Sequence, residues 1–493
     1  MRLLLLLVPA AVAVLARLIT GPHPIDDAYI TFRYARNFAE GLGLVYNPGE
    51  WVLGTTAPLW AVVLAAGYRL GFSDLPWLAT LVSALCDAAS AALIAHLCTR
   101  MGWKPLGAAL VGLVWALNPM SIAYASGGME SSLFALMALV CLSLAASGRH
   151  VLIAAGIAGV ATLVRPEGAF LAATLVGWTW LASRRLALRS ALVAATPMAI
   201  GGAIFFVLYG SPLPHSIAAK QVAYLPVEPL ENLFVLLIHA GLPGWSTYLL
   251  AVVPAALAAV LAIFGLIGLV VLIVGALPRL ERRSVAWQPF AVFAVLYFSF
   301  YALLGLRGVR IFNWYLLPME PLYLLVAAAG LASFGGLRRP WLAALLLVWQ
   351  LPAIDWRQPL LPAGETLLRE QLFAEVGQGL RLSMPPTATV AAPEIGALGY
   401  MSNLRVLDTV GLVSPAALPY YPLPPEQHVT DNAIPSRLIE NQRPDVVVTL
   451  DAYVQRTLLT DPAFQREYYL EAAYPAVVWQ STELLVFRRV AER

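Results

Sequence analysis

Apolar segments long enough to cross a membrane recur along this chain, and they constrain its fold more than any other feature. A helix needs about twenty consecutive apolar residues to span the hydrocarbon core. Charged residues make up only 12% of the 493 residues, about half of the roughly 25% typical of soluble domains. We therefore predict an α-helical polytopic membrane protein with about eleven spans. The predicted spans are Leu3–Thr20, Pro76–Thr99, Pro105–Ala125, Met129–Ser147, Val151–Val164, Gly168–Ser183, Ser190–Tyr209, Thr247–Ala276, Trp287–Gly305, Trp314–Phe334 and Trp341–Ile354.

Basic residues between the spans set the predicted orientation, because cytoplasmic loops of membrane proteins are enriched in Lys and Arg. With a cytoplasmic N-terminus, five basic loops fall on the same side, and an odd number of spans places the C-terminus outside. We expect a multi-pass protein of the plasma (inner) membrane, with the first span retained rather than cleaved as a signal peptide. The basic loops contain Arg100 and Lys104; Arg149 and His150; Arg184, Arg185 and Arg189; Arg279, Arg282 and Arg283; and Arg338 and Arg339.

One apolar run, Ala57–Leu70, does not fit this alternation. Counting it as a span would place Arg100 and Lys104 outside, and the run is also short. We therefore predict a juxtamembrane helix within a long first external loop, residues 21–75. Loops of this length inside a compact protein usually carry function.

The composition changes after Ile354, where the chain becomes charged and rich in Pro. We predict a transmembrane domain over residues 1–356 and an extracytoplasmic α/β domain over residues 357–493. Short patterns within the second domain predict its elements. They are an amphipathic helix at Thr366–Leu382, buried strands at Ala388–Ala392, Arg405–Asp408 and Val446–Leu450, and a terminal hairpin of Val477–Gln480 and Glu483–Arg488.

Two adjacent carboxylates, Asp26 and Asp27, open the first external loop at the start of a predicted helix, Asp27–Glu40. Capping of that helix is the simplest explanation, because Asp accepts hydrogen bonds from the first N–H groups of a helix. A cap needs only one Asp, and two neighbouring charges repel each other unless a partner is present. The pair is therefore a candidate for catalysis.

Other external segments carry isolated charges. Each charge alone is explained by an interfacial side chain or a loop ion pair, but together they place carboxylates and cations on one side of one bundle. Charges near a membrane are functional candidates by default, because leaving them unpaired costs free energy. The residues are Arg33, Glu130, Arg165, His215, Lys220, Arg307 and Arg310.

This set of residue types fits the transfer of a sugar from a polyprenyl phosphate. Arg or Lys would bind the phosphate and stabilise the charge that develops as it leaves. A carboxylate would deprotonate the acceptor hydroxyl. The sequence contains no phosphate-binding glycine loop, dinucleotide fingerprint or zinc motif, so nothing in it supports a nucleotide-sugar donor.

The first loop contains three motifs, Asp26–Ala35, Gly41–Glu50 and Gly54–Trp60. They resemble motifs of bacterial GT-C glycosyltransferases, above all of the terminal β-arabinofuranosyltransferase branch. This branch is similar to the protein mannosyltransferases and the lipid A aminoarabinose transferases. Weaker matches follow at Gly128–Ser131, Arg165–Gly168, Pro214–Lys220 and Val406–Leu412.

The resemblance implies a polyprenyl-phosphate sugar donor, a glycan, lipid or protein acceptor, and no nucleic acid partner. It also implies that Asp26 or Asp27 is the catalytic base, and that a divalent metal (Mg or Mn), if one is bound, lies at Asp27 and Glu130. The family often has Asp-Glu where this chain has Asp-Asp. The chain also departs from the arabinosyltransferase pattern at Trp51–Gly54. The sugar is therefore left open.

Two other functions compete with this interpretation. A transporter or flippase for a lipid-linked glycan would need charged residues near the middle of the bilayer, and Asp87 and His96 are the nearest candidates. A hydrogen bond between helices explains each of them more simply. A non-catalytic protein of envelope assembly would tolerate loss of the first-loop carboxylates.

Overall fold

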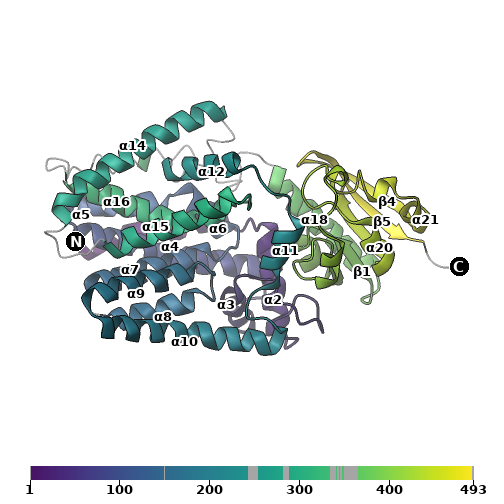
Figure 1. Cartoon of the computed structure of the whole chain (residues 1–493), viewed down its shortest axis with the longest axis horizontal. Coiled ribbons are helices and arrows are strands. Elements are labelled where there is room, and N and C mark those ends of the chain that lie inside the picture. Colours follow the sequence, from purple (N-terminus) through teal and green to yellow (C-terminus); the bar gives the residue numbers. More distant parts are fainter. Residues whose placement is uncertain are drawn as a thin grey trace. The chain divides into compact units, whose positions relative to one another are not determined.

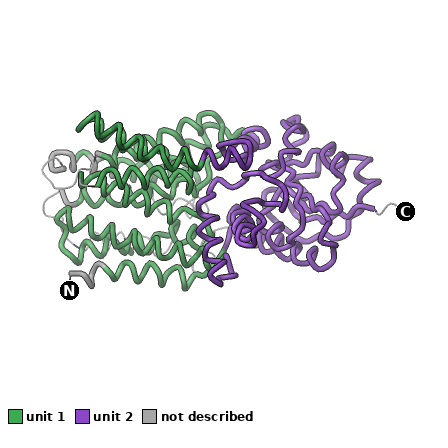
Figure 2. The backbone as a smooth tube through the Cα atoms, turned by 90° about the horizontal axis from the view of Figure 1, so that it is seen from below, with its two compact units in different colours: residues 1–23, 76–201, 226–362 green, residues 24–75, 202–225, 363–493 purple. Residues whose placement is uncertain are grey.

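The computed structural model describes residues 2–148, 150–241, 254–280, 288–333, 340, 344, 347–348 and 365–490. The chain divides into two compact units (Figure 2). Unit 1 comprises residues 1–23, 76–201 and 226–362, and unit 2 comprises residues 24–75, 202–225 and 363–493. The predicted domain boundary at residues 356 and 357 lies outside the described residues and stays a prediction.

Unit 1 is built of apolar helices (Figure 1). Most predicted spans coincide with a helix to within a few residues, because long apolar runs leave few alternatives to a helix in lipid. The last predicted span, Trp341–Ile354, and the start of Thr247–Ala276 lie outside the described residues. The helices are α1 (Arg2–Thr20), α4 (Leu75–Arg100), α5 (Pro105–Ala116), α6 (Pro119–Ser126), α7 (Ser131–Ser147), α8 (Val151–Ala161), α9 (Gly168–Ala182), α10 (Arg184–Tyr209), α12 (Pro229–Gly241), α14 (Ala255–Leu280), α15 (Gln288–Leu306), η1 (Asn313–Tyr315), η2 (Leu317–Met319) and α16 (Glu320–Ser333).

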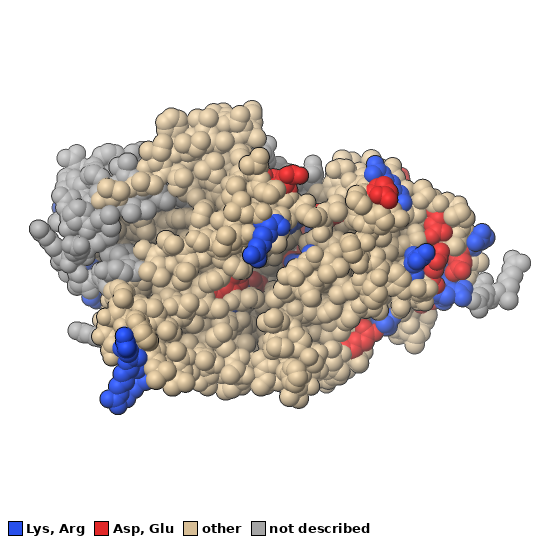
Figure 3. Space-filling model, viewed as in Figure 1, with Lys and Arg blue, Asp and Glu red and all other residues tan. Residues whose placement is uncertain are grey.

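Within the described part of the chain, four helices are long and apolar enough to cross a membrane, and a fifth span results if α5 and α6, bent by 46°, count as one. Shorter apolar helices of 10–17 residues accompany them. Figure 3 shows a face on which charged side chains are sparse over these helices. The chain is therefore a multi-pass membrane protein, while the count of eleven spans and the orientation stay predictions. Arg149, Arg282, Arg283, Arg338 and Arg339 lie outside the described residues.

Small residues allow the helices of unit 1 to approach one another closely. A Cβ atom at Gly159 of α8 would lie 2.2 Å from the carbonyl oxygen of Ala194 in α10, and one at Gly112 of α5 would lie 2.9 Å from that of Ala91 in α4. Such contacts drive association in lipid, where helices gain little from burying apolar surface. Glycine is therefore required at these two crossings.

A buried ion pair connects α1 and α4. Arg17 Nε lies 3.0 Å from Asp87 Oδ2, and both side chains are fully buried. Ser121 and Ser132 donate hydrogen bonds to the same carboxylate oxygen at 2.9 and 3.0 Å. Asp87 therefore has the bonds between helices that the simpler interpretation predicted, whereas His96 of α4 is exposed.

Unit 2 combines the first loop with the C-terminal residues. In the loop, α2 (Asp26–Ala39) and the predicted juxtamembrane helix, α3 (Pro58–Arg69), pack together. The five-stranded sheet has the order β2-β1-β3-β5-β4, parallel from β2 to β3 and antiparallel from β3 to β4. The remaining elements are α11 (His215–Ala223), α18 (Glu365–Ser383), β1 (Thr389–Ala392), α19 (Gly396–Ser402), β2 (Arg405–Asp408), η4 (Pro415–Tyr420), η5 (Pro425–Gln427), α20 (Ser436–Gln442), β3 (Val446–Leu450), η6 (Asp451–Tyr453), η7 (Leu458–Thr460), α21 (Pro462–Glu467), β4 (Tyr468–Val478) and β5 (Ser481–Arg489).

The terminal hairpin is longer than the sequence predicted. β4 begins at Tyr468 instead of Val477, and Trp479 and Gln480, with φ of 48° and 65°, form the turn rather than the strand. β4 is the outer strand of the sheet, and most of its side chains are exposed. It therefore lacks the alternation of buried and exposed residues on which the prediction depends.

We predict that Asp87→Ala strongly destabilises unit 1, because Arg17 would remain buried without its counter-charge. Breaking a buried pair in this way typically costs about 3–5 kcal/mol, and a lower melting temperature in lipid nanodiscs would report it. The paired replacement Arg17→Met with Asp87→Leu is the control, and it should destabilise less. Equal stability of Asp87→Ala and the wild type would contradict the assignment.

Candidate functional site

Asp26 binds the N-terminus of α19. Its two carboxylate oxygens accept hydrogen bonds from the backbone N–H groups of Gly396 and Ala397, both at 2.9 Å. A Cβ atom at Gly396 would lie 1.8 Å from the backbone oxygen of Asp26, so the two segments are in direct contact. The N-cap of α2 itself is Ile25, which makes no side-chain cap. Asp26 therefore caps a helix that lies 370 residues further along the chain.

A buried group of charges surrounds Asp26. Arg369 is ion-paired with Glu370 at 2.5 Å and with Glu394 at 3.4 Å, and its guanidinium lies 4.1 Å from the ring centroid of Trp479. The Asp26 backbone N–H donates to Glu370 at 3.1 Å. Three buried carboxyl groups thus accompany one guanidinium in unit 2, and two of them are ion-paired with it.

This imbalance changes how Asp26 ionises. Burial, the largest cause, and the Glu394 carboxylate raise the pKa of Asp26, Arg369 opposes them, and the net pKa is about 7. Burial also raises the pKa of Glu370. A carboxyl group that is 8% exposed and bound to two N–H groups is poorly placed to reach a substrate. These contacts favour a positioning role for Asp26 in the first loop, and its predicted role as a base stays a prediction.

Asp27 has a different environment from its neighbour. It lies in the first turn of α2 and is partly exposed. Among the residues that the structure describes, none makes a hydrogen bond or ion pair with its carboxylate. Of the two adjacent acids, Asp27 alone presents a carboxylate that an acceptor hydroxyl can approach.

Arg33, which the sequence suggested for phosphate binding, is occupied by protein groups. It is 1% exposed and donates to the backbone oxygens of Tyr46, Gly399 and Leu404 at 2.6–2.8 Å, and to Asn47 Oδ1 at 3.3 Å. Its guanidinium also lies 4.3 Å from the ring centroid of Tyr46. These contacts favour a structural role, in which Arg33 holds the first loop against residues 399–404.

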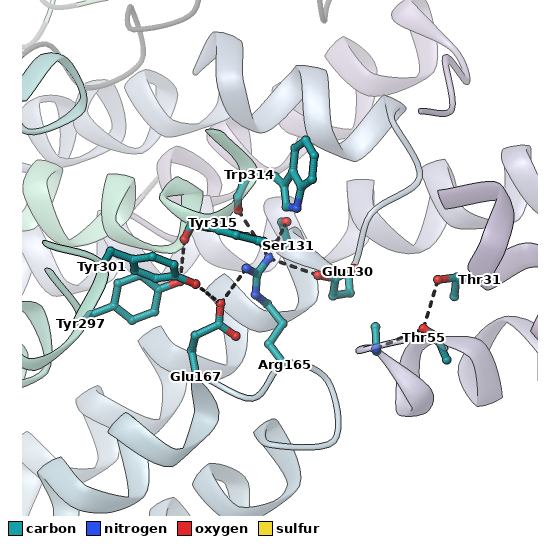
Figure 4. Close-up of polar contacts among 11 residues, drawn as sticks. Thr31, Thr55, Glu130, Ser131, Arg165, Glu167, Tyr297, Tyr301, Trp314 and Tyr315 are labelled. Carbon is teal, nitrogen blue, oxygen red and sulfur yellow. Dashed lines mark hydrogen bonds and ion pairs between the residues drawn. The ribbon is translucent and has the colours of Figure 1, made fainter. Parts of the chain in front are cut away.

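The second acidic loop forms its own cluster, within unit 1 (Figure 4). Arg165 is ion-paired with Glu130 at 3.1 Å and with Glu167 at 2.8 Å, and it donates to Ser131 Oγ at 3.3 Å. Tyr301 of α15 donates a short hydrogen bond to Glu167. The predicted acidic and basic residues of these two turns are thus brought together.

Aromatic rings close this cluster on one side. The Arg165 guanidinium lies 5.6 Å from the ring centroid of Tyr315, which stacks on Tyr301 at 5.5 Å. Burial alone would raise the pKa of Glu167, but the Arg165 charge and hydrogen bonds from Arg165 and Tyr301 hold it below its ordinary value. The cluster therefore keeps a charged guanidinium between two carboxylates at the turn between α8 and α9.

The other predicted cations lie apart from these two clusters along the chain. His215 and Lys220 are on α11, and the Lys220 ammonium lies 6.0 Å from the ring centroid of Tyr224. Arg307 and Arg310 follow α15, with Arg307 exposed and Arg310 partly buried. All four stay candidates for contact with the donor phosphate.

The metal prediction has little support from the geometry. Within the described ranges, no three His, Cys, Asp or Glu side chains are arranged to hold a metal ion. Glu130 already has Arg165 as its counter-charge, and Asp27 belongs to the other compact unit. A divalent metal at Asp27 and Glu130 stays a prediction.

Hydrogen bonds of Thr55 in the first loop and of Asp408 in β2 order the segments around these two residues. Thr31 and Thr55 are hydrogen-bonded at 3.3 Å (Figure 4), and Thr55 also accepts from the Ala57 N–H at 3.1 Å. Asp408 is fully buried and accepts from the Val410 and Val413 N–H groups at 2.9 Å. Asp408 therefore orders the loop that follows β2.

The buried charges around Asp26 were not predicted from the sequence. Arg369 and Glu370 lie on a helix that the pattern predicted as amphipathic, where charges normally face solvent, and Glu394 follows a short strand. Their common feature is burial at 3–8% exposure. An adjacent Arg-Glu pair on the first turns of that helix was the one available signal.

Comparison with known proteins supports the resemblance seen in the first loop. The chain is 31% identical over 228 residues to a terminal β-(1→2)-arabinofuranosyltransferase of Corynebacterium glutamicum. The sequence resemblance is thus confirmed. The match covers 40% of this chain and about a third of the length of that relative.

Two further comparisons describe the whole chain and its C-terminal part. The structure of ArnT from Cupriavidus metallidurans bound to undecaprenyl phosphate aligns with 99% of this chain and 98% of its own, with a TM-score of 0.46 and 15% identity. The structure of the same protein in the apo state aligns with 98% of this chain and 97% of its own, with a TM-score of 0.44 and 15% identity. Residues 364–487 match a domain of unknown function, DUF8728.

We predict that Asp26→Asn changes how stability depends on pH. The raised pKa of Asp26 means that its contribution to stability is complete below about pH 4 and is lost as the pH rises through about 7. The wild type should therefore exceed the variant in melting temperature most at low pH, and the difference should shrink by several degrees towards pH 8. Groups that titrate in both proteins cancel in this difference. A difference that grows with pH would contradict the assignment.

Proposed function

We propose that this protein is a membrane glycosyltransferase that transfers a sugar from a polyprenyl-phosphate donor to an envelope glycan, lipid or protein. The observation that carries the proposal is the state of Asp27. It is a partly exposed carboxylate, with no partner in the described part of the chain, beside an Asp that is locked in protein contacts. The arabinofuranosyltransferase relative and the membrane helices support this reaction class.

Asp27 would act as general base. Its carboxylate accepts the proton of the acceptor hydroxyl, the hydroxyl oxygen forms a bond to the anomeric carbon, and the bond from that carbon to the phosphate oxygen breaks. The electron pair of the broken bond leaves with the polyprenyl phosphate. Because a phosphate leaves readily as an anion, the chain needs cations at that point and no strong acid.

The cations for this step would come from the residues that are at least partly accessible. Lys220, Arg307 and Arg310 are partly or fully exposed, whereas Arg33 and Arg165 are 1% and 3% exposed and engaged with protein acceptors. Arg165 would instead fix the turn at Glu130 and Glu167. Lys or Arg at the phosphate supplies charge-assisted hydrogen bonds that strengthen as negative charge develops.

Asp27→Asn should lower kcat by about 10²–10⁴-fold, the usual contribution of a general base, with little change in donor binding or melting temperature. The assay measures polyprenyl phosphate released from a panel of polyprenyl-phosphate sugars by the protein in lipid nanodiscs, with envelope glycans as acceptors. Glu40→Gln, which neutralises an exposed carboxylate just after the same helix, is the matched control and should retain activity.

Three results would separate this proposal from its competitors. Full activity of Asp27→Asn would exclude it as the base. Movement of a lipid-linked glycan across vesicles without sugar transfer would favour a transporter, which the buried pairing of Asp87 does not support. The same release with and without EDTA would show that no divalent metal takes part.

A further inference from the structure

A pocket of about 400 Å³ lies within unit 2, and neither Asp26 nor Asp27 is among its lining residues. Its walls come from three parts of the chain: residues 51–53 of the first loop, residues 209–221 around the start of α11, and Pro415 at the start of η4. This volume is in the lower part of the range of about 300–1,000 Å³ that is typical of ligand sites.

The lining is neutral and has both aromatic and polar members. Trp51 and Tyr209 lie with ring centroids 6.1 Å apart and planes at 48°. Ser211, His215 and Gln221 contribute the polar groups, and the lining includes no Asp, Glu, Lys or Arg. Aromatic rings bury the apolar C–H face of a sugar, and hydroxyl, amide and imidazole groups bond to its hydroxyls.

The walls are held in place without a ligand. Tyr209 donates to the Leu44 carbonyl oxygen at 2.7 Å, and the His215 N–H donates to the Leu53 carbonyl oxygen at 2.8 Å. Trp51 packs on Gly43, which has φ of +94° and where a Cβ atom would lie 2.8 Å from the indole ring. A pocket that is already formed loses less ordering entropy when it binds.

His215 lines the pocket, and its Nε2 is buried and has no hydrogen bond to any described residue. Burial lowers the pKa of His215, although the Gly411 backbone opposes this effect, so the imidazole is neutral at pH 7. A neutral imidazole in an uncharged pocket suits a hydroxyl group better than a phosphate, so His215 is a candidate for contact with the acceptor instead of the donor phosphate.

We infer that this pocket binds a neutral sugar unit of a glycan acceptor. The inference rests on the proposed glycosyl transfer for the identity of the occupant, and on the lining for its chemistry. A lipid chain fits less well, because it would cover Ser211, His215 and Gln221 without replacing their hydrogen bonds with water. The acceptor would thus be held by aromatic contact with Trp51 and Tyr209 and by hydrogen bonds from the polar lining residues.

The test measures binding and transfer separately with the full-length protein in lipid nanodiscs. Neutral oligosaccharides of arabinofuranose, mannose and glucose are titrated without donor and followed by saturation-transfer NMR, with dodecyl phosphate as the lipid-like probe. Trp51→Ala should weaken binding of the preferred oligosaccharide by about tenfold, and Trp51→Phe should restore part of it. Gln221→Ala, at an exposed position on the rim, should weaken binding without affecting folding.

The control is Tyr469→Ala, which removes an aromatic side chain of similar exposure (48%, against 47% for Trp51) from β4, outside the pocket. Equal affinity in the wild type, Trp51→Ala and Gln221→Ala would overturn the inference. So would an absence of oligosaccharide binding, or displacement of the oligosaccharide by dodecyl phosphate.

Transfer kinetics distinguish failure of this inference from failure of the proposed function. If transfer occurs, Trp51→Ala should raise the KM for the acceptor and leave the kcat for release of polyprenyl phosphate at saturating acceptor unchanged. Transfer with an unchanged acceptor KM would refute the pocket assignment and leave the proposed function intact. Oligosaccharide binding that depends on Trp51, with no transfer from any donor, would support the pocket assignment and refute the proposed function.

Discussion

The contact between Asp26 and the N-terminus of α19 is the interaction on which unit 2 depends. One carboxyl group accepts two backbone N–H groups at 2.9 Å and joins a loop near the start of the chain to a domain near its end. Arg33 adds three bonds to backbone oxygens, two of them in the same distant region. Together with the bonds that Arg36 donates to the Tyr400 carbonyl oxygen and to Asn403 Oδ1, these contacts fix α2 against the C-terminal residues.

In the proposed mechanism, the neighbouring acids Asp26 and Asp27 have different roles. Asp26 and Asp27 are consecutive on a helix, so their side chains point in directions about 100° apart. The first is buried against protein N–H groups, and the second is partly exposed. If Asp27 is the base, as proposed, its rigid neighbour limits the motion of that base, and small errors in the position of a catalytic group slow a reaction strongly.

The sequence predicted the elements of this fold better than their contacts. Long apolar runs predicted α4, α9 and α15 to within a few residues, and the strands β2 and β3 begin and end where the pattern of buried residues predicted. The first loop was singled out by its acids. Sequence periodicity carries no information on partners that lie 344–371 residues apart, such as those of Asp26 and Arg33. For this reason the bonds of Arg33 and the charges around Asp26 emerged only from the structure.

The separation of Asp26 from its partners has a consequence for biosynthesis. At the usual rate of about 5–20 residues per second, the 370 residues between Asp26 and Gly396 take about 20–70 s to synthesise. During that time the first loop has left the ribosome, while the N–H groups that bind its carboxylate do not yet exist. The loop must remain soluble and unaggregated over this interval. Folding of unit 2 is therefore a late event that follows synthesis of the helices.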